Sequence, residues 1–530
     1  MTMIDARKLD TNTVIEADLC IIGAGAAGIS IACELAGKGI RIALIEAGDR
    51  EYDRASQSLY SGYNVGLPTD PPTASRIRVL GGSTTAWAGQ CGTLNRDDFE
   101  VRPWVPYSGW PFSLESLRPY YQRAQTFMEF GPDEIAWTAV DDRPVLRLQD
   151  NVLEPKMFRF CETTDFRVLH RERVERAENI VTYLNANVVG IEQSESGCRV
   201  TGLRVRTLEG RGHIFRANAF VLAAGGLENI RLMLSSNREA GGIGNDADIV
   251  GRFFMDHPFV YSGVVHFNEP AMEKNAHVNE GYDRLSSMHW RMAAIQFAED
   301  WLRNEQLVNC AVHFLRRPAF KTTKEYNSRA GVSLNALFQA LRAGFPVGPH
   351  WSRHIRRAVK GSRTIAKSRV AQLGHLVRPR SALALRVTLE NTPDPASRVY
   401  LTSHADKLGI PLLAVDWRIG EIERRSLNRF HQVLGDAMIA AGLGSIELRF
   451  EEDDTGWPSS LSSGKHHMGG TRMHSDRKQG VVNTDCRVHG IDNLFVAGSS
   501  VFPTGGYANP TFTIIALSIK LADHLRRKLS

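Results

Sequence analysis

The stretch that decides the fold is Ala17-Asp18-Leu19-Cys20-Ile21-Ile22-Gly23-Ala24-Gly25-Ala26-Ala27-Gly28. Its apolar half predicts a strand over 18–22, and the GxGxxG turn that follows predicts a helix of small residues over 26–37. A second strand over 41–45 ends at Glu46. This βαβ order is the context in which the glycine fingerprint binds a dinucleotide. A glycine-rich turn without a ligand is the alternative, and it leaves the strands and the terminal acid unexplained.

Each glycine of the fingerprint has a separate task. Gly23 permits the tight turn, Gly25 lets the backbone approach a pyrophosphate, and Gly28 lets the helix pack on the strand. The first helical residues, 26–27, present free N–H groups and the positive end of the helix dipole to phosphates. Glu46 is placed to accept hydrogen bonds from ribose hydroxyls.

Length and composition indicate a two-domain α/β protein. The 530 residues are enough for two substantial cores, and 43% apolar residues with 46 Gly fit many tight turns. Residues 1–16 lack the apolar region of a secretory signal, and no run of 18 apolar residues occurs. The seven cysteines are scattered without a CxxC pair, which favours a reducing compartment and argues against zinc or a disulfide framework. The expected location is the cytoplasm.

The positive charge of the chain is concentrated in one segment. Residues 316–380 contain 15 Lys and Arg against a single acid, Glu325, so the rest of the chain carries more acids than bases. Apolar residues recur there at roughly helical spacing, and we interpret the segment as a solvated helical insertion. Contact with a membrane surface, an acidic redox partner or an anionic substrate is the alternative. A nucleic-acid partner is not expected, because no series of aromatic residues interleaves the charges.

Two further strand signals also end on glycine. FVLAAGG (220–226) reads as a buried strand that breaks before a helix, and LFVAG (494–498) is a second, shorter one. With the N-terminal strand they would meet at one sheet edge, where doubly wound sheets bind ligands. The loop RVLGGSTTAW (78–87) adds a glycine pair able to reach a pyrophosphate or a flavin. This downstream context favours FAD over NAD, and it leaves the intervening sequence to form a second domain.

These motifs resemble those of the glucose–methanol–choline oxidoreductases, which use FAD to oxidise alcohols. The resemblance covers nearly the whole chain and includes GRFFMDHP (251–258), PASRVYL (395–401) and the stretch 465–525. The HxGGTRM and NPT forms of the C-terminal motifs are similar to the branch with pyranose oxidases, fructose dehydrogenase flavosubunits and bacterial enzymes that oxidise sugars or glycosides.

The resemblance implies an α/β (α+β) fold. A Rossmann-like FAD-binding domain would be assembled from residues 1–100, 180–260 and 480–530. Residues 100–180 and 260–480 would form a substrate domain, with a mostly antiparallel sheet flanked by helices and a basic helical insertion at 316–380.

The resemblance also implies a catalytic pair. The histidine four residues before Thr471 is His467, and the Asn of the NPT motif is Asn509. His467 would take the hydroxyl proton while hydride leaves for the flavin, and Asn509 would hydrogen-bond the substrate oxygen, since an amide cannot take a proton. His466 is a competitor because it adjoins His467. A metal site that includes His474 is not expected, since few other ligands lie nearby.

The cofactor is expected to be FAD held without a covalent bond. In the pyranose-oxidase branch a histidine just before the loop tryptophan can carry the flavin, and here that position is Ala86. The residues expected to contact FAD are Gly23, Gly25, Ala26, Ala27, Gly28, Glu46, Arg78, Gly81, Gly82, Ser83, Thr85, Trp87, Val188, Ala224, Gly225, Asn229, Gly498, Ser499, Asn509, Pro510 and Thr511.

The predicted function is oxidation of a hydroxyl of a sugar, glycoside or related cyclic polyol to a carbonyl, with oxygen, a quinone or a redox protein as electron acceptor. Two alternatives stay open. One is oxidation of an apolar alcohol such as a sterol or terpenoid, and the other is a flavin subunit that works only within an electron-transfer complex.

Overall fold

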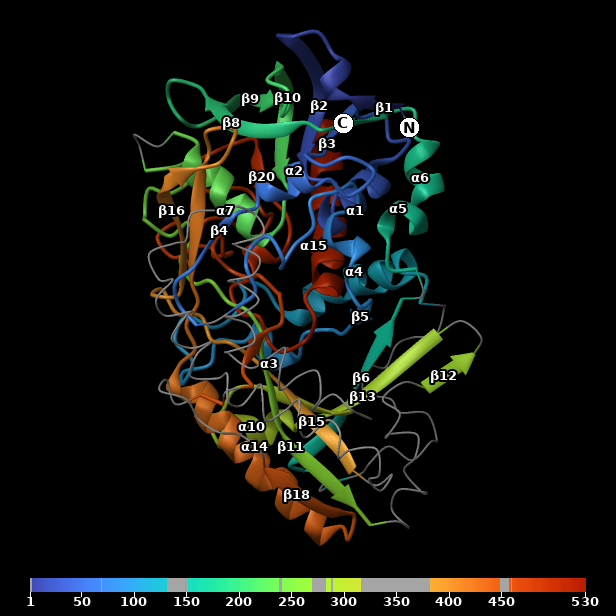
Figure 1. Cartoon of the computed structure of the whole chain (residues 1–530), viewed down its shortest axis with the longest axis vertical. Helices are drawn as coiled ribbons and strands as arrows, with labels where there is room; N and C mark the ends of the chain where they lie inside the picture. The colour runs from blue at the N-terminus through green and yellow to red at the C-terminus, as the bar shows by residue number, and fades with distance from the viewer. Residues whose placement is uncertain are drawn as a thin grey trace.

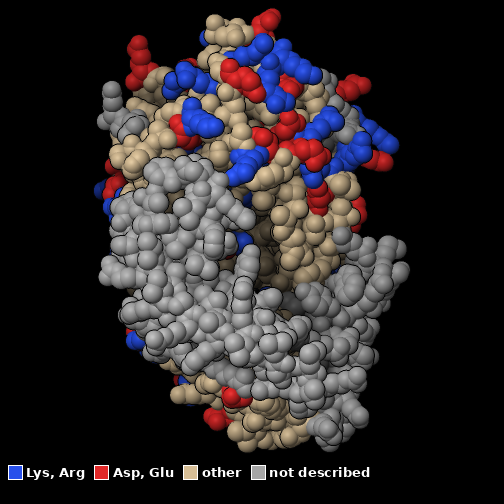
Figure 2. Space-filling model, viewed as in Figure 1, with Lys and Arg blue, Asp and Glu red and all other residues tan. Residues whose placement is uncertain are grey.

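The computed structural model describes the whole chain except residues 1, 68, 131–147, 149–150, 162, 238–240, 269–282, 287–288, 316–381, 449–456 and 459. The predicted basic helical insertion at 316–380 therefore lies outside the described residues. Two large sheets lie at opposite ends of the long axis, and both chain termini lie beside the first of them (Figure 1). On the visible face, acidic and basic side chains are interspersed around this first sheet (Figure 2).

The first sheet is mainly parallel and contains the predicted nucleotide-binding strands. Its order is β1-β7-β3-β2-β10-β9-β8, and β20 pairs with the carboxyl end of β10. The neighbouring strands β1, β7, β3, β2 and β10 pair in parallel, and β20 is parallel to β10. Strand β9 is antiparallel to both β10 and β8. The strand bounds are β1 (Thr2–Asp5), β2 (Thr13–Ile22), β3 (Ile42–Ile45), β7 (Ile180–Leu184), β8 (Asn187–Gln193), β9 (Val200–Arg206), β10 (Gly212–Leu222) and β20 (Leu494–Val496).

The βαβ unit forms as the fingerprint predicts, because its residues are small where helix and strand approach. Helix α1 (Ala26–Leu35) follows β2 and is almost entirely buried. A Cβ atom on Gly28 would lie 1.9 Å from the carbonyl oxygen of Gly23, so only glycine allows this approach. The C-terminal helix α15 (Thr511–Leu529) packs against α1 and against α4 (Leu114–Phe127), which ties the two ends of the chain together.

The second sheet is antiparallel in every strand pairing that the structure describes, as the sequence predicts for the substrate domain. Its order is β18-β11-β15-β14-β13-β6-β5, with β12 beside β13 and β19 beside β11. A separate hydrophobic core forms between this sheet and helix α14 (Glu421–Ala440). The strand bounds are β5 (Gln90–Cys91), β6 (Leu153–Phe160), β11 (Pro258–Phe267), β12 (Asp283–Ser286), β13 (His289–Phe297), β14 (Cys310–Leu315), β15 (Ala382–Leu389), β18 (Gly444–Leu448) and β19 (Ser462–Ser463).

A third, small sheet was not anticipated from the sequence. It joins β16 (Arg398–Ala405), β17 (Pro411–Asp416) and β4 (Gly62–Asn64), which is parallel to β17. Helix α7 (Gly226–Ser235) packs against β16 and β17. The shorter helices are α2 (Arg54–Ser58), α3 (Arg96–Phe99), α5 (Phe166–Leu169), α6 (Arg171–Glu175), α10 (Glu299–Asn304) and the 3-10 turns η1 (Ala6–Lys8), η2 (Gly82–Thr85) and η4 (Ser499–Val501).

The mixed α/β fold class is thus confirmed, while the domain limits stay a prediction. One detail departs from them, since β5 lies within 1–100 and yet pairs with β6 of the second sheet. Among the residues that the structure describes, no helix combines the length and the apolar character needed to cross a bilayer.

Candidate active site

A cavity of about 490 Å³ opens at the carboxyl ends of β2, β3, β10 and β20. It extends to the loop 464–467 and to Arg386 of β15, so both large sheets contribute to its wall. The three predicted strand–glycine ends therefore meet at one place. A doubly wound sheet binds its ligand at such an edge, because the strand ends there leave loops and helix N-termini free.

The backbone around the fingerprint leaves open space where a ligand would lie. Gly23 has a φ of +104°, and a Cβ atom on it would lie 2.6 Å from the carbonyl oxygen of Ala223, so both conformation and packing require glycine. In the part of the chain that the structure describes, a Cβ atom on Gly25 would have a single contact beyond its chain neighbours, the Gly82 Cα atom at 3.9 Å. Gly25 caps the N-terminus of α1 and lines the cavity, so its backbone is accessible to a phosphate.

Glu46 stands at the end of β3 with its carboxylate held by two backbone amides. The N–H groups of Ala24 and Gly48 donate to its two oxygens at 2.9 and 2.8 Å. Burial raises the pKa of Glu46, although these hydrogen bonds act in the opposite direction. Each oxygen keeps acceptor capacity toward the cavity that Glu46 lines. Together with the open glycines, this donor and acceptor set fits the adenosine and pyrophosphate parts of FAD.

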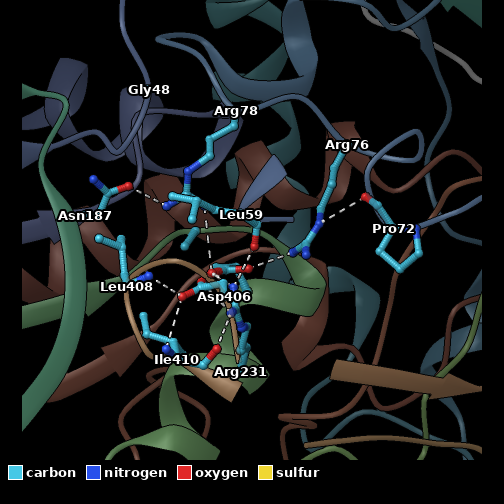
Figure 3. A network of polar contacts seen from close by, with 12 residues as sticks. Gly48, Leu59, Pro72, Arg76, Arg78, Asn187, Arg231, Asp406, Leu408 and Ile410 are labelled. Carbon is cyan, nitrogen blue, oxygen red and sulfur yellow. Dashed lines mark hydrogen bonds and ion pairs between the residues drawn. The ribbon is translucent and has the colours of Figure 1, made fainter. Parts of the chain in front are cut away.

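A buried ionic network is shown in Figure 3. Arg76, Arg78 and Glu228 of this network line the cavity. Glu228 of α7 lies 3.0 Å from Arg76 and 3.3 Å from Arg231, and Arg231 also pairs with Asp406 at 2.7 Å. Burial would raise the pKa of Glu228, but the surrounding guanidinium groups hold it below its usual value. Arg78 donates to Asn187 at 2.9 Å. The network holds the loop 76–80, which precedes the Gly81-Gly82 pair, against α7 and the third sheet.

The structure places Asn509 beside His466, the neighbour of the predicted base His467. Asn509 Nδ2 lies 3.4 Å from His466 Nε2, and both residues line the cavity. On its other side, His466 Nδ1 lies 2.8 Å from His257 Nδ1, and the His466 backbone N–H donates to Asp256 at 2.8 Å. Which of the two histidines is the base stays a prediction, since both line the cavity. Adjacent side chains in an irregular loop point in different directions, which the HHMGGT sequence alone does not resolve.

His467 also lines the cavity. Its closest contacts are made by its backbone carbonyl group and hold the loop in place. Its carbonyl oxygen accepts from Ser499 Oγ at 2.6 Å, and a Cβ atom on Gly226 would lie 2.4 Å from that oxygen. Its ring lies 6.0 Å from that of Phe254, measured between centroids. Burial lowers the pKa of His467 to about 3, with Arg76 and Lys465 acting in the same direction.

Most of the other predicted cofactor residues line this cavity. Those that do are Gly23, Gly25, Ala26, Ala27, Glu46, Arg78, Gly82, Ser83, Trp87, Val188, Ala224, Gly225, Gly498, Ser499, Asn509, Pro510 and Thr511, together with Ala86. Those outside the lining are Gly28, Gly81, Thr85 and Asn229.

Two of these departures have a clear structural reason. In η2 the neighbouring Thr84, not Thr85, lines the cavity, and the Thr85 hydroxyl donates instead to the carbonyl oxygen of Gly82. Asn229 is buried behind the wall, where it accepts from the Ala224 N–H and donates to the Ala497 carbonyl. It orders two of the strand ends and does not face the cavity.

Several residues that line the cavity were not predicted from the sequence. Tyr60, Arg76 and Arg386 line the cavity although they lie in segments without a glycine motif. The guanidinium of Arg76 lies over the Tyr60 ring at 3.8 Å, and that of Arg386 lies 5.3 Å from the Phe259 ring. Nothing local in the sequence marks Tyr60 or Arg76, and the only signal for Arg386 is its place in the apolar run 383–389. In the part of the chain that the structure describes, no group of three His, Cys, Asp or Glu side chains is arranged to hold a metal.

Comparison with known proteins identifies two sequence families along the chain. Residues 18–238 match the profile described as FAD dependent oxidoreductase, and residues 393–518 match the C-terminal profile described as GMC oxidoreductase. The fructose dehydrogenase large subunit of Gluconobacter japonicus is 24% identical, over 98% of this chain and 99% of its own length. The 6'''-hydroxyparomomycin C oxidase of Streptomyces lividus is 22% identical, over 96% and 92%.

Among solved structures, the chain is similar to pyridoxine 4-oxidase from Mesorbium loti. The TM-score is 0.57 at 17% sequence identity, and the match covers 96% of this chain and 99% of that protein. At this identity the similarity concerns the fold, which extends over both large sheets.

Proposed function

Because this chain belongs to the glucose–methanol–choline family of FAD-dependent oxidoreductases acting on CH–OH groups, we propose that it oxidises a hydroxyl of a sugar, glycoside or related cyclic polyol to a carbonyl. The family, the cofactor and the class of reaction predicted from the sequence are confirmed by these matches. The substrate class is supported by the names of end-to-end relatives, a fructose dehydrogenase and an aminoglycoside-type oxidase.

The observation that carries the mechanism is the His466–Asn509 pair in the wall of the cavity. Nε2 of His466 faces Asn509 Nδ2 at 3.4 Å, which is a long contact that a substrate hydroxyl can replace. We assign His466 as the base that takes the hydroxyl proton, and Asn509 as the donor that orients the hydroxyl oxygen. His467, which lines the same cavity, is the alternative base.

FAD supplies the two-electron acceptor for the hydride that leaves the carbinol carbon. The residues proposed to hold it are the open glycines, the α1 N-terminus and Glu46 for the adenosine and pyrophosphate, and the 82–87 loop with Gly498 and Pro510 nearer the histidines. Ala86 lines the cavity at the position where related enzymes carry a linking histidine, so we propose that the cofactor is held without a covalent bond.

An anaerobic stopped-flow screen tests the substrate class. Purified yellow protein is mixed with sugars, glycosides and cyclic polyols on one side, and with sterols and terpenoid alcohols on the other. Loss of the oxidised flavin absorbance with the first group supports the proposal. Reduction by the apolar alcohols alone would replace it with that alternative.

A second candidate function is supported by one observation. The relative from Gluconobacter japonicus is named as a large subunit, and this chain covers 99% of its length. A chain of this kind can pass electrons to a partner protein rather than to oxygen. Reoxidation of the substrate-reduced flavin by a quinone or a cytochrome but not by oxygen would favour this role.

A further inference from the structure

His257 is a buried histidine whose ring meets the ring of His466. It lies directly before Pro258, the first residue of β11, and is fully buried. The two Nδ1 atoms are 2.8 Å apart, and the rings are nearly perpendicular with centroids 4.9 Å apart. This is a direct hydrogen bond between two imidazoles, and Asp256, the preceding residue, holds the His466 backbone N–H at 2.8 Å. The Asp256-His257 pair therefore fixes His466 from both sides.

The contact between the two rings constrains where their protons lie. A neutral imidazole carries one proton, so one of the two facing nitrogens must donate and the other must accept. If His257 donated, His466 Nδ1 would accept, and the only proton of His466 would lie on Nε2. In that arrangement Nε2 has no free lone pair and cannot take a proton from a substrate. If His466 donates from Nδ1, its Nε2 is an acceptor toward the cavity.

Two neighbours favour the second arrangement. The atom of Asn509 that faces His466 Nε2 is the amide nitrogen, a donor that needs a lone pair on Nε2. Burial lowers the pKa of His257 to about 4, while the backbone of Gly505 and Gly506 acts in the opposite direction and favours a proton on that ring. His257 Nε2 lies near Gly505 and has no hydrogen-bond partner among the described residues, so it competes with no other group for the acceptor role of Nδ1. A proton on His257 Nε2 leaves its Nδ1 free to accept.

We infer that His257 is a positioning residue for the reaction: its Nδ1 accepts the Nδ1–H of His466 and keeps His466 Nε2 unprotonated toward the substrate. The inference rests on the proposed role of His466 as base. When Nε2 takes the hydroxyl proton, His466 becomes an imidazolium that still donates to His257 from Nδ1. His257 gains no proton in this step and acts only through the ring that it holds.

The charges around the pair agree with a ring that starts neutral. His467 and Arg386 both disfavour a positive charge on His466, as does burial, and Glu390 favours a proton on His257. Asp256 accepts from Ser463 Oγ at 2.6 Å as well as from the His466 N–H, and burial raises its pKa to about 6.

Replacement of His257 by two different residues tests the inference. His257→Asn places a side-chain oxygen near the original Nδ1 and retains an acceptor, whereas His257→Phe retains the ring shape without one. We expect the rate of flavin reduction by a sugar or glycoside to fall by roughly 10²-fold in His257→Phe, in line with tautomer-setting partners elsewhere. His257→Asn should recover most of that loss, and KM should change little in both. Equal losses in the two variants would overturn the inference.

The matched control is His431→Phe, because His431 is a buried histidine of α14 that bonds Ser262 and lies outside the cavity lining. It measures the effect of removing a buried imidazole as such, and its reduction rate should stay within about twofold of wild type.

A second readout needs no substrate and no replacement of His257. In protein with 15N-labelled histidine, the resonances lost in His466→Gln identify His466. At neutral pH we expect its Nδ1 to carry the proton and its Nε2 to show the shift of a bare nitrogen. A protonated Nε2 in wild type would overturn the inference. If no sugar or glycoside reduces the flavin, the proposed substrate fails, but the tautomer of His466 is still decided.

Discussion

At the scale of single residues, His466 lies in surroundings that keep its imidazole neutral. Burial lowers the pKa of His466 well below its usual value, and His257, His467 and Arg386 act in the same direction. A base must be unprotonated before it reacts, so this low pKa keeps nearly the whole population in the working form at neutral pH. The same low pKa means that the proton taken from a substrate is released readily afterwards.

Replacement of His466 by alanine should slow the reductive half-reaction without loss of FAD. A positioned general base typically contributes about 10²–10⁴-fold in rate, and we expect a loss of that order in stopped-flow measurements at saturating substrate. In wild type the rate should be independent of pH above about 6.5, the ordinary pKa of histidine, and should fall only in more acidic solution. That acidic decline should be absent in His466→Ala.

The adjacent histidine provides the control for this prediction. His467→Ala should have a much smaller effect, and Asn509→Ala an intermediate one, because the amide orients the hydroxyl and takes no proton. If His467→Ala is the slow variant and His466→Ala is not, the base is the residue that the HxGGT spacing indicated, and the Asn509 contact has another purpose.

The alanine at position 86 leads to a second residue-scale prediction. Ala86 lines the cavity and offers no atom that could bond covalently to the flavin. Acid precipitation should therefore release yellow FAD into the supernatant, and a denaturing gel of the protein should show no flavin fluorescence. Fluorescence that stays with the polypeptide would mean that another cavity residue forms the link.

At the scale of secondary-structure elements, the β2–α1 turn separates the roles of its glycines. Gly28 and Gly23 are required by the protein itself, since added Cβ atoms would lie 1.9 and 2.6 Å from backbone oxygens. Among the described residues, apart from its neighbours in the chain, such a Cβ on Gly25 would approach the Gly82 Cα atom alone, at 3.9 Å, so the turn tolerates a side chain there. The glycine at position 25 is therefore explained by the cofactor that we propose for the cavity, and not by the packing of the turn.

Gly25→Val should therefore give a folded protein that lacks FAD. Its far-ultraviolet circular dichroism should match that of the wild-type apoprotein, while the flavin absorbance is lost. Gly28→Val should instead reduce the yield of soluble protein, because the side chain would force α1 away from β2. Gly435→Ala, in α14 with nothing within 4 Å of the added atom, is a control that should keep FAD and raise stability by about 0.5–1 kcal/mol. A yellow Gly25→Val protein would contradict the proposed phosphate position.

The elements also show what the sequence could predict and what it could not. The βαβ unit and the strand–glycine ends follow local patterns, so the carboxyl ends of these strands were predicted to within two residues. Strands β2 and β10 begin well before the predicted strands, at Thr13 and Gly212. The third sheet joins residues 62–64 to residues 398–416, and nothing local in either segment signals that pairing. The contact between His257 and His466 likewise spans 209 positions. The choice between His466 and His467 depended on loop geometry, which a run of two histidines does not encode.

At the scale of the whole molecule, burial strongly lowers the pKa of six histidines in the described part of the chain. Burial lowers the pKa of His170 and His467 to about 3 and that of His257 and His431 to about 4. His313 and His466 are shifted in the same direction by burial. These histidines lie in both large cores and at the cavity between them. Their protonation therefore lowers the free energy of unfolding of the whole fold and not of one element.

Acidification from pH 7.5 to 5 should therefore destabilise the protein cooperatively. A histidine whose folded pKa is depressed binds a proton only after unfolding, so its contribution is complete above about pH 6.5 and is lost as the pH falls. Each such histidine can cost up to about 1.4 kcal/mol per pH unit below 6.5. Buried carboxyl groups act in the opposite direction, because burial raises the pKa of Asp98 to about 8 and that of Asp256 to about 6. Burial also raises the pKa values of Glu46, Glu299 and Glu423.

We expect the six histidines to outweigh these carboxyl groups below pH 6.5, where every histidine becomes protonated on unfolding. The midpoint of thermal unfolding, followed by release of flavin fluorescence, should therefore fall steadily below pH 6.5. His431→Phe removes one titrating ring far from the cavity and should make the decline shallower. A midpoint that is constant or rises between pH 7.5 and 5 would mean that the carboxyl groups dominate the acid response of the fold.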